Sequence, residues 1–153
     1  MTRDERGQVG GIEAVAFGLL ILIGGILLIS NAWAIVDAKM AAGTSAREAA
    51  RTFAKAVGSD PTDAAAQADL AGRETLAELG WRRRDITITN SGPGFARCAP
   101  VSFAVSIPVR AFRLPFLPLG PRSFAVTARH TERVDPYRSG VPGTLPAQCR
   151  GAE

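Results

Sequence analysis

The sequence predicts an α+β protein with a long N-terminal transmembrane helix, a second helix and a small three-stranded antiparallel sheet. Two observations lead to this prediction. An apolar run without any charge covers residues 14–36. Beyond residue 80 the hydrophobic period changes from helical to alternating, which is typical of strands with one buried face.

The apolar run is long enough to cross a bilayer. It holds 23 residues, and a spanning helix needs roughly 20. No helix breaker follows it, and alanine-rich sequence continues to about residue 57. We therefore expect one helix from Ile12 to about Val57, half of it outside the membrane. Its weak points are the glycine pair at 24–25 and the stretch 43–45, because glycine is a poor helix former.

A second helix is expected from its end signals. Gly58 fits the C-cap of the first helix, while Asp60 and Pro61 fit the N-cap and first position of the next. This helix should run to about Leu79, with Gly80 as its cap. The positions expected to form its apolar face are Leu70, Leu76, Leu79 and several alanines.

Three strands are expected at residues 85–89, 101–109 and 123–133, joined by a turn at 90–94 and a proline- and glycine-rich loop. The side chains expected to point inward are Val101, Phe103, Val105, Ile107, Val109, Phe124, Val126 and Ala128. From Asp135 onward the apolar content is too low to fold alone. The expected organisation is a cytoplasmic leader (1–12), a transmembrane and extended helix (13–57), an extracytoplasmic α+β domain (58–134) and a flexible tail (135–153).

No catalytic set is evident. His130 is the only histidine and is expected on an exposed or edge position, so no histidine-based triad has its partners. No glycine-rich phosphate loop follows a strand. The two cysteines with one histidine do not have zinc-site spacing. We therefore expect no enzyme, no cofactor and no metal. Outside the cytoplasm, Cys98 and Cys149 could form a disulfide.

The charge balance does not indicate a nucleic-acid partner. Basic residues outnumber acidic ones by 18 to 14, for a net charge of +4. The densest point is the arginine run at 82–84. No interleaved aromatic stacking platform accompanies it. We interpret the run as a solvated surface.

Glu13 stands directly before the apolar run, and two interpretations remain open. In the first, it is a helix N-terminal carboxylate at the lipid interface, held by the dipole and water. In the second, it mediates assembly with neighbouring helices. Gly10, Ala14 and Gly18 recur every four positions on one face, a small-xxx-small pattern that allows close helix approach. These four residues are the candidate helix-assembly set.

Several of these residues resemble those of a known family. Arg6–Gly7 ahead of a glycine-rich leader, Glu13 opening the apolar run, and the sequence AREAAR at 46–51 resemble TadE/TadG-like pilus-assembly proteins of the tight-adherence system. The alternating strand at 101–109 and the strand ending at 133 are similar to the C-terminal region of that family.

The resemblance implies a pseudopilin or minor pilin, a single-pass membrane protein of the cell envelope. Its implied partners are other pilin or pilus-assembly proteins, a secretion platform and a prepilin peptidase. The implied processing site lies between Gly7 and Gln8. The family pattern places glutamate fifth after the cut, whereas a cut after Gly7 makes Glu13 the sixth residue. Two outcomes stay open: a cleaved filament subunit, or a protein that keeps its leader and acts as an anchor.

Two alternatives compete with this interpretation. Residues 32–34 satisfy the small-x-small rule for signal peptidase, which would release a secreted protein beginning at Ile35 after a cut behind Ala34. The other alternative is a membrane-anchored extracytoplasmic binding module unrelated to pili. It predicts that Glu13 can be replaced without loss of function.

Flanking charges do not decide the orientation. Two arginines precede the apolar run, and three basic residues follow it within 15 positions. The positive-inside rule therefore does not favour a cytoplasmic leader. The expected orientation, with the C-terminal domain outside the cytoplasm, follows from the resemblance and from the cysteines.

Overall fold

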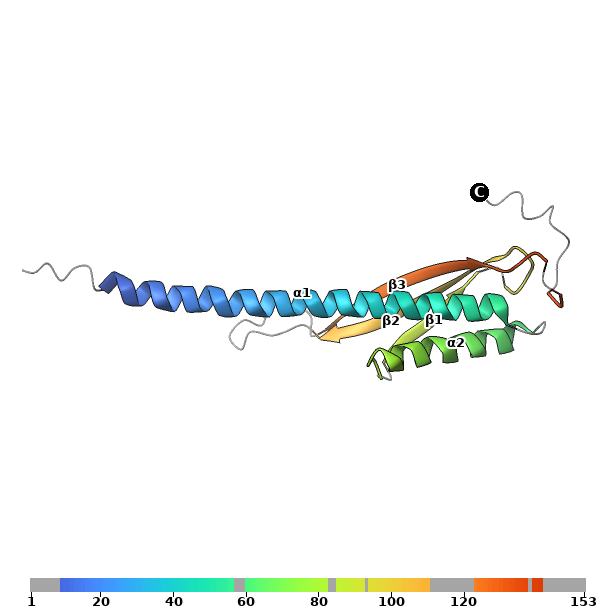
Figure 1. The fold of residues 1–153 in the computed structure, drawn as a ribbon, viewed down its shortest axis with the longest axis horizontal. Helices are drawn as coiled ribbons and strands as arrows, with labels where there is room; N and C mark the ends of the chain where they lie inside the picture. The colour runs from blue at the N-terminus through green and yellow to red at the C-terminus, as the bar shows by residue number, and fades with distance from the viewer. Residues whose placement is uncertain are drawn as a thin grey trace, which may run out of the picture.

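The computed structural model describes residues 9–56, 60–82, 85–92, 94–110, 123–137 and 139–141. Two helices, α1 (Val9–Lys55) and α2 (Pro61–Glu78), precede three strands, β1 (Thr87–Ser91), β2 (Pro100–Arg110) and β3 (Ser123–Arg133). The N-terminal half of α1 projects alone, while its C-terminal half packs beside α2 and against β2 and β3 of the sheet (Figure 1). The predicted α+β class, with a long apolar helix and a three-stranded antiparallel sheet, is confirmed.

Helix α1 is one uninterrupted helix of 47 residues, which makes it about 70 Å long. It begins three residues before the expected start and passes through both expected weak points, 24–25 and 43–45. Each glycine costs only about 1 kcal/mol in a helix, and extending an existing helix is cooperative. Leucine- and isoleucine-rich turns flank 24–25 and alanine-rich turns flank 43–45, so good helix formers carry the helix across both positions.

Helix α2 has both end structures that the sequence predicts. The Asp60 side chain accepts a 2.8 Å hydrogen bond from the Thr62 backbone amide, and proline occupies the first turn. At the other end Gly80 adopts a φ of 86°. Its amide donates to the Ala77 carbonyl, and the next amide, of Trp81, donates to the Leu76 carbonyl. These two bonds form a Schellman motif, which ends the helix at a glycine.

The sheet has the order β1-β2-β3, and both pairs are antiparallel. The expected inward side chains of β2 are all buried, as are Val126 and Ala128 of β3. Pairing with β1 ends at Ser106, so the end of β2 that contains Pro108 has only β3 as a partner among the described strands. Proline has no N–H to donate to a neighbouring strand. It is therefore tolerated at a strand end where one edge has no partner.

Strand β1 lies two residues later than predicted, and the turn starts correspondingly later. Asp85 is in a turn, although Ile86 is still buried. The strand ends at Ser91 and is followed by Gly92. A Cβ at Gly92 would lie 2.7 Å from the Pro100 carbonyl oxygen, so the close backbone approach requires glycine there.

The core is built on a spine of small residues in α1. Two clusters are present, one near the middle of the molecule and one near the end of α1. The spine consists of Ala38, Ala42, Ala46, Ala49 and Ala50. At its end the Phe53 ring meets Phe95 edge-on at a centroid distance of 5.4 Å and lies 5.7 Å from Phe103. Small residues allow the sheet and α2 to approach the helix closely from two sides.

Two expectations about the core are corrected. Leu70 and Leu79 are 61% and 50% exposed, so they do not form the buried face of α2. That face consists of Ala64, Ala68, Gly72 and Leu76. At Gly72 the two helices are too close for a larger side chain. The segment expected to be a tail also contributes, because Val141 is buried in the second cluster.

Candidate assembly face of the long helix

The N-terminal half of α1 is apolar and uncovered on nearly every side. Its exposed side chains include Val15 (72%), Leu20 (68%), Leu28 (71%) and Trp33 (73%). Burying one such side chain is worth about 1.5–3 kcal/mol, and a continuous apolar surface of this extent marks a membrane or protein contact. Within the described residues, this is the one helix long and apolar enough to cross a membrane.

The apolar run has charged residues at both ends. Glu13 precedes it, and Asp37 and Lys39 follow it, all three exposed. The 23 uncharged residues between Glu13 and Asp37 span about 34 Å, against a hydrocarbon core of about 30 Å. Trp33 lies near the far boundary, where tryptophan is typical of a membrane–water interface. The run therefore has the length of a single membrane span, and its flanking charged residues and Trp33 are typical of the two ends of such a span.

The predicted helix-assembly residues lie on this projecting half. Glu13, Ala14 and Gly18 are exposed, and an added Cβ at Gly18 would meet nothing within 4 Å. A second helix could therefore approach this face closely. Gly10 is also in α1, but its surroundings are not described. Gly7 and Gln8, the candidate processing residues, lie outside the described residues.

On a different face of the same segment, a row of partly buried residues continues into the core of the folded domain. Leu27, Asn31, Ala34 and Ala38 recur at helical spacing and are all at least partly buried. The Asn31 Oδ1 atom is shielded from solvent and accepts no hydrogen bond from the described part of the chain. Sequence reasoning did not single out Asn31. In the sequence, Asn31 could be recognised as unusual because it is the one amide side chain within residues 14–36.

The folded domain is attached to α1 directly after the apolar run. Ala34 packs against the first core cluster. The Lys39 ammonium donates to the Thr127 carbonyl oxygen of β3. The domain therefore begins within one turn of the end of the span, and its position is fixed relative to the helix axis.

Several polar groups gather at the opposite end of α1. The His130 Nε2 atom lies 3.3 Å from the Glu132 carboxylate, and both side chains are about one-third or more exposed. An open hollow of about 470 Å³ is lined by Arg51, Ala54, Lys55, Glu132, Arg133 and Asp135. In the described ranges no three histidine, cysteine or acidic side chains are grouped as metal ligands.

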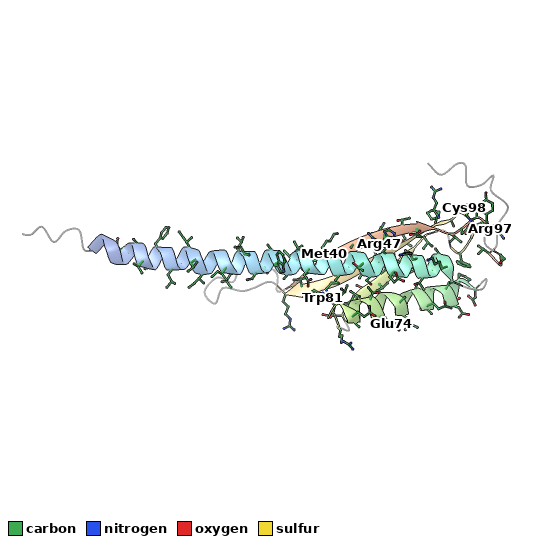
Figure 2. All side chains as sticks on the ribbon, viewed as in Figure 1. Met40, Arg47, Glu74, Trp81, Arg97 and Cys98 are labelled. Atoms are coloured by element: carbon green, nitrogen blue, oxygen red, sulfur yellow. The ribbon has the colours of Figure 1, made fainter. Side chains whose placement is uncertain are left out.

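Cys98 lies in the loop before β2, at the end of the domain far from the projecting helix (Figure 2). It has a φ of 62°, and its amide donates to the Val134 carbonyl after β3. Cys98 is disulfide-bonded. Cys149 lies outside the described residues, so its pairing with Cys98 stays a prediction. Of the arginine run, Arg82 is exposed and the other two residues are not described.

Comparison with known proteins finds no matching family model, no matching curated protein and no matching solved structure.

Proposed function

We propose that this chain is a single-pass, pilin-like component of a tight-adherence type pilus or secretion assembly, with its C-terminal domain outside the cytoplasm. The observation that carries the proposal is the uninterrupted helix α1. Its first half is an uncovered apolar surface, and its second half is the alanine spine of the folded domain.

The continuity of α1 favours a packed subunit over a tethered binding module. A module that only needs an anchor can have a flexible linker between membrane and domain. Here the helix continues through residues 24–25 and 43–45 without a break, and Ala34 packs on the domain core. Packing of the apolar half against neighbours would therefore set the position of the domain rigidly, as in an ordered assembly.

Glu13 is proposed as the residue that selects a neighbour. In an assembly of extracted helices its carboxylate would neutralise the N-terminal amine of an adjacent subunit, since an unpaired charge in apolar surroundings is costly. The Ala14–Gly18 face allows the close approach that this pairing needs. The proposed partners are pilin or pilus-assembly proteins and a prepilin peptidase. The proposed role is structural, without catalysis.

The first test is the mature N-terminus, measured by intact mass and N-terminal sequencing of the protein from its native host. A start at Gln8 supports a processed pilin. An intact leader supports a permanently anchored assembly factor. A start at Ile35 contradicts the proposal, because the apolar half of α1 would be removed.

The second test is co-purification of pilus components with the Glu13→Ala variant. The expected result is a clear loss relative to wild type. Glu48→Ala is the matched control, because Glu48 is an exposed carboxylate on the same helix outside the apolar run. Unchanged co-purification with Glu13→Ala would instead favour a membrane-anchored binding module.

A further inference from the structure

The exposed side of α1 outside the apolar run carries a basic stripe. Between residues 39 and 55 the helix has four basic side chains and one acidic one. The exposed residues that align along this side are Met40, Thr44, Arg47, Arg51 and Lys55. We call them the basic stripe. Arg47 and Arg51 form no ion pair within the described part of the chain.

Helix α2 carries an acidic stripe of the same geometry. Between residues 60 and 78 there are five carboxylates and one arginine. The exposed residues that align on this side are Asp63, Gln67, Leu70, Glu74 and Glu78. Both stripes have the spacing 4, 3, 4, 4. Arg73 is paired with Asp69 off the stripe, whereas Glu74 and Glu78 have no ion-pair partner among the described residues.

Within one molecule, Arg47 and Arg51 form no ion pair with Glu74 or Glu78. Each stripe lies on the side of its helix opposite to the buried residues, because positions half a turn away, such as Ala49 in α1 and Gly72 in α2, face the core. Arg47 and Glu74 accordingly lie on different sides of the helix pair (Figure 2). Arg51 borders hollows that also contain Glu48, Gln67, Glu132 and Asp135. The two stripes therefore come near each other at Gln67, but Arg51 forms no ion pair with any of the three carboxylates.

We propose that the basic stripe of one copy binds the acidic stripe of a second copy of this chain, with Arg47 opposite Glu78 and Arg51 opposite Glu74. Copies that share a membrane orientation have parallel α1 helices. Since α2 returns antiparallel to α1, the α2 of a neighbour also runs antiparallel to α1. With the two helices antiparallel, Arg47 and Arg51, which are one turn apart, lie opposite Glu78 and Glu74, which are also one turn apart.

This contact implies an axial step between neighbours. Gly72 lies beside Ser45 and Ala49 of its own α1, so Glu74 is level with about residue 45. Bringing Glu74 level with Arg51 requires a shift of six residues, about 9 Å. Two copies so displaced cannot both be centred in one flat bilayer, because the span exceeds the hydrocarbon core by only about 4 Å.

Each copy uses one stripe toward each of two neighbours. Such a heterologous contact generates an open row or helix instead of a closed dimer. Exposed ion pairs are individually weak, so the contact depends on several pairs along the two stripes acting together. The stepped arrangement rests on the proposed pilin-like function, whereas the charge contact itself can be tested without any pilus component.

The test uses full-length chains bearing two different tags, mixed in nonionic detergent micelles, which impose no common depth on the two helices, and then captured by one tag. The acidic variant is Arg47→Glu with Arg51→Glu, and the basic variant is Glu74→Arg with Glu78→Arg. Each should lose capture of its own kind by about tenfold, because attraction becomes repulsion at two exposed pairs. A mixture of the two variants should regain wild-type capture, since unlike stripes then face each other in both directions.

The control variant is Arg110→Glu with Arg129→Glu, which changes the same charge at exposed positions away from the stripes. It should capture like wild type. Raising the salt to about 1 M should weaken capture by wild type, because exposed pairs are screened. Capture that survives in both charge-reversed variants overturns the proposal, as does failure of their mixture to bind. Glu13→Ala retains both stripes, so its effect on pilus co-purification is separable from stripe binding.

Discussion

The Ser45 hydroxyl donates a 2.8 Å hydrogen bond to the Gly72 carbonyl oxygen and thereby joins α1 to α2. Ser45 is fully buried. A Cβ at Gly72 would lie 3.0 Å from Ile88 Cδ1, 3.2 Å from Ser45 Oγ and 3.4 Å from Ala49 Cβ. Gly72 is therefore the point at which both helices and β1 come together, and the missing side chain is what allows it.

Replacing Gly72 with valine should disrupt this crossing. The added methyl groups have no space between Ser45, Ala49 and Ile88, and overpacking of this kind costs about 1–3 kcal/mol. We expect the free energy of unfolding of the full-length chain in nonionic detergent, followed by circular dichroism, to fall by that amount.

The matched control is Gly43→Ala in α1. Its Cβ would meet only Ala128 Cβ, at 4.0 Å, so the gain in helix propensity of up to about 1 kcal/mol should dominate. Equal destabilisation by both variants would mean that the crossing at Gly72 is no tighter than the contact at Gly43.

The Asp60 N-cap should make stability depend on pH in the acid range. Hydrogen bonds from Thr62 lower the pKa of Asp60 below its usual 3.8. Because the folded-state pKa is lowered, the stabilisation is complete above the unfolded-state pKa and is lost as the pH falls through the folded-state pKa. Asp60→Asn keeps an acceptor that does not titrate.

Thermal unfolding of wild type and Asp60→Asn should therefore be compared from about pH 6 to about pH 2. Wild type should be the more stable at the upper end, and its advantage should shrink toward the lower end. Melting temperatures that stay parallel over the whole range would show that the Asp60 charge does not contribute.

Local signals predicted most of the fold. Asp60 and Gly80 have fixed stereochemical roles at helix ends, and the alternation of β2 allows only one face to be buried. The face of α2 was mispredicted because it is decided by tertiary distance. Leu70 is more apolar than Gly72, yet only the glycine fits where α1 passes. Hydrophobicity ranks side chains, but it does not measure the space between two helices.

The candidate site was partly predictable for a related reason. The apolar run can be read directly, since a charge-free stretch of this length has few uses in a water-soluble domain. The two charged stripes cannot be predicted from the sequence alone, because they become continuous surfaces only when the buried side of each helix is known. Arg47 and Glu74 look like ordinary helix charges until Ser45 and Gly72 are known to face inward.

Asn31 provides the last prediction. Its Oδ1 atom is shielded and receives no hydrogen bond from the described residues, and an unsatisfied buried polar atom costs about 1–3 kcal/mol. Asn31→Leu has nearly the same size and removes that atom, so the full-length chain in detergent should keep its fold and unfold at an equal or higher temperature. Asn31→Asp should instead insert poorly, because a charge inside the span costs up to about 3 kcal/mol. A lower melting temperature for Asn31→Leu would mean that the amide does find a hydrogen-bond partner, and cross-linking from this position would then identify it.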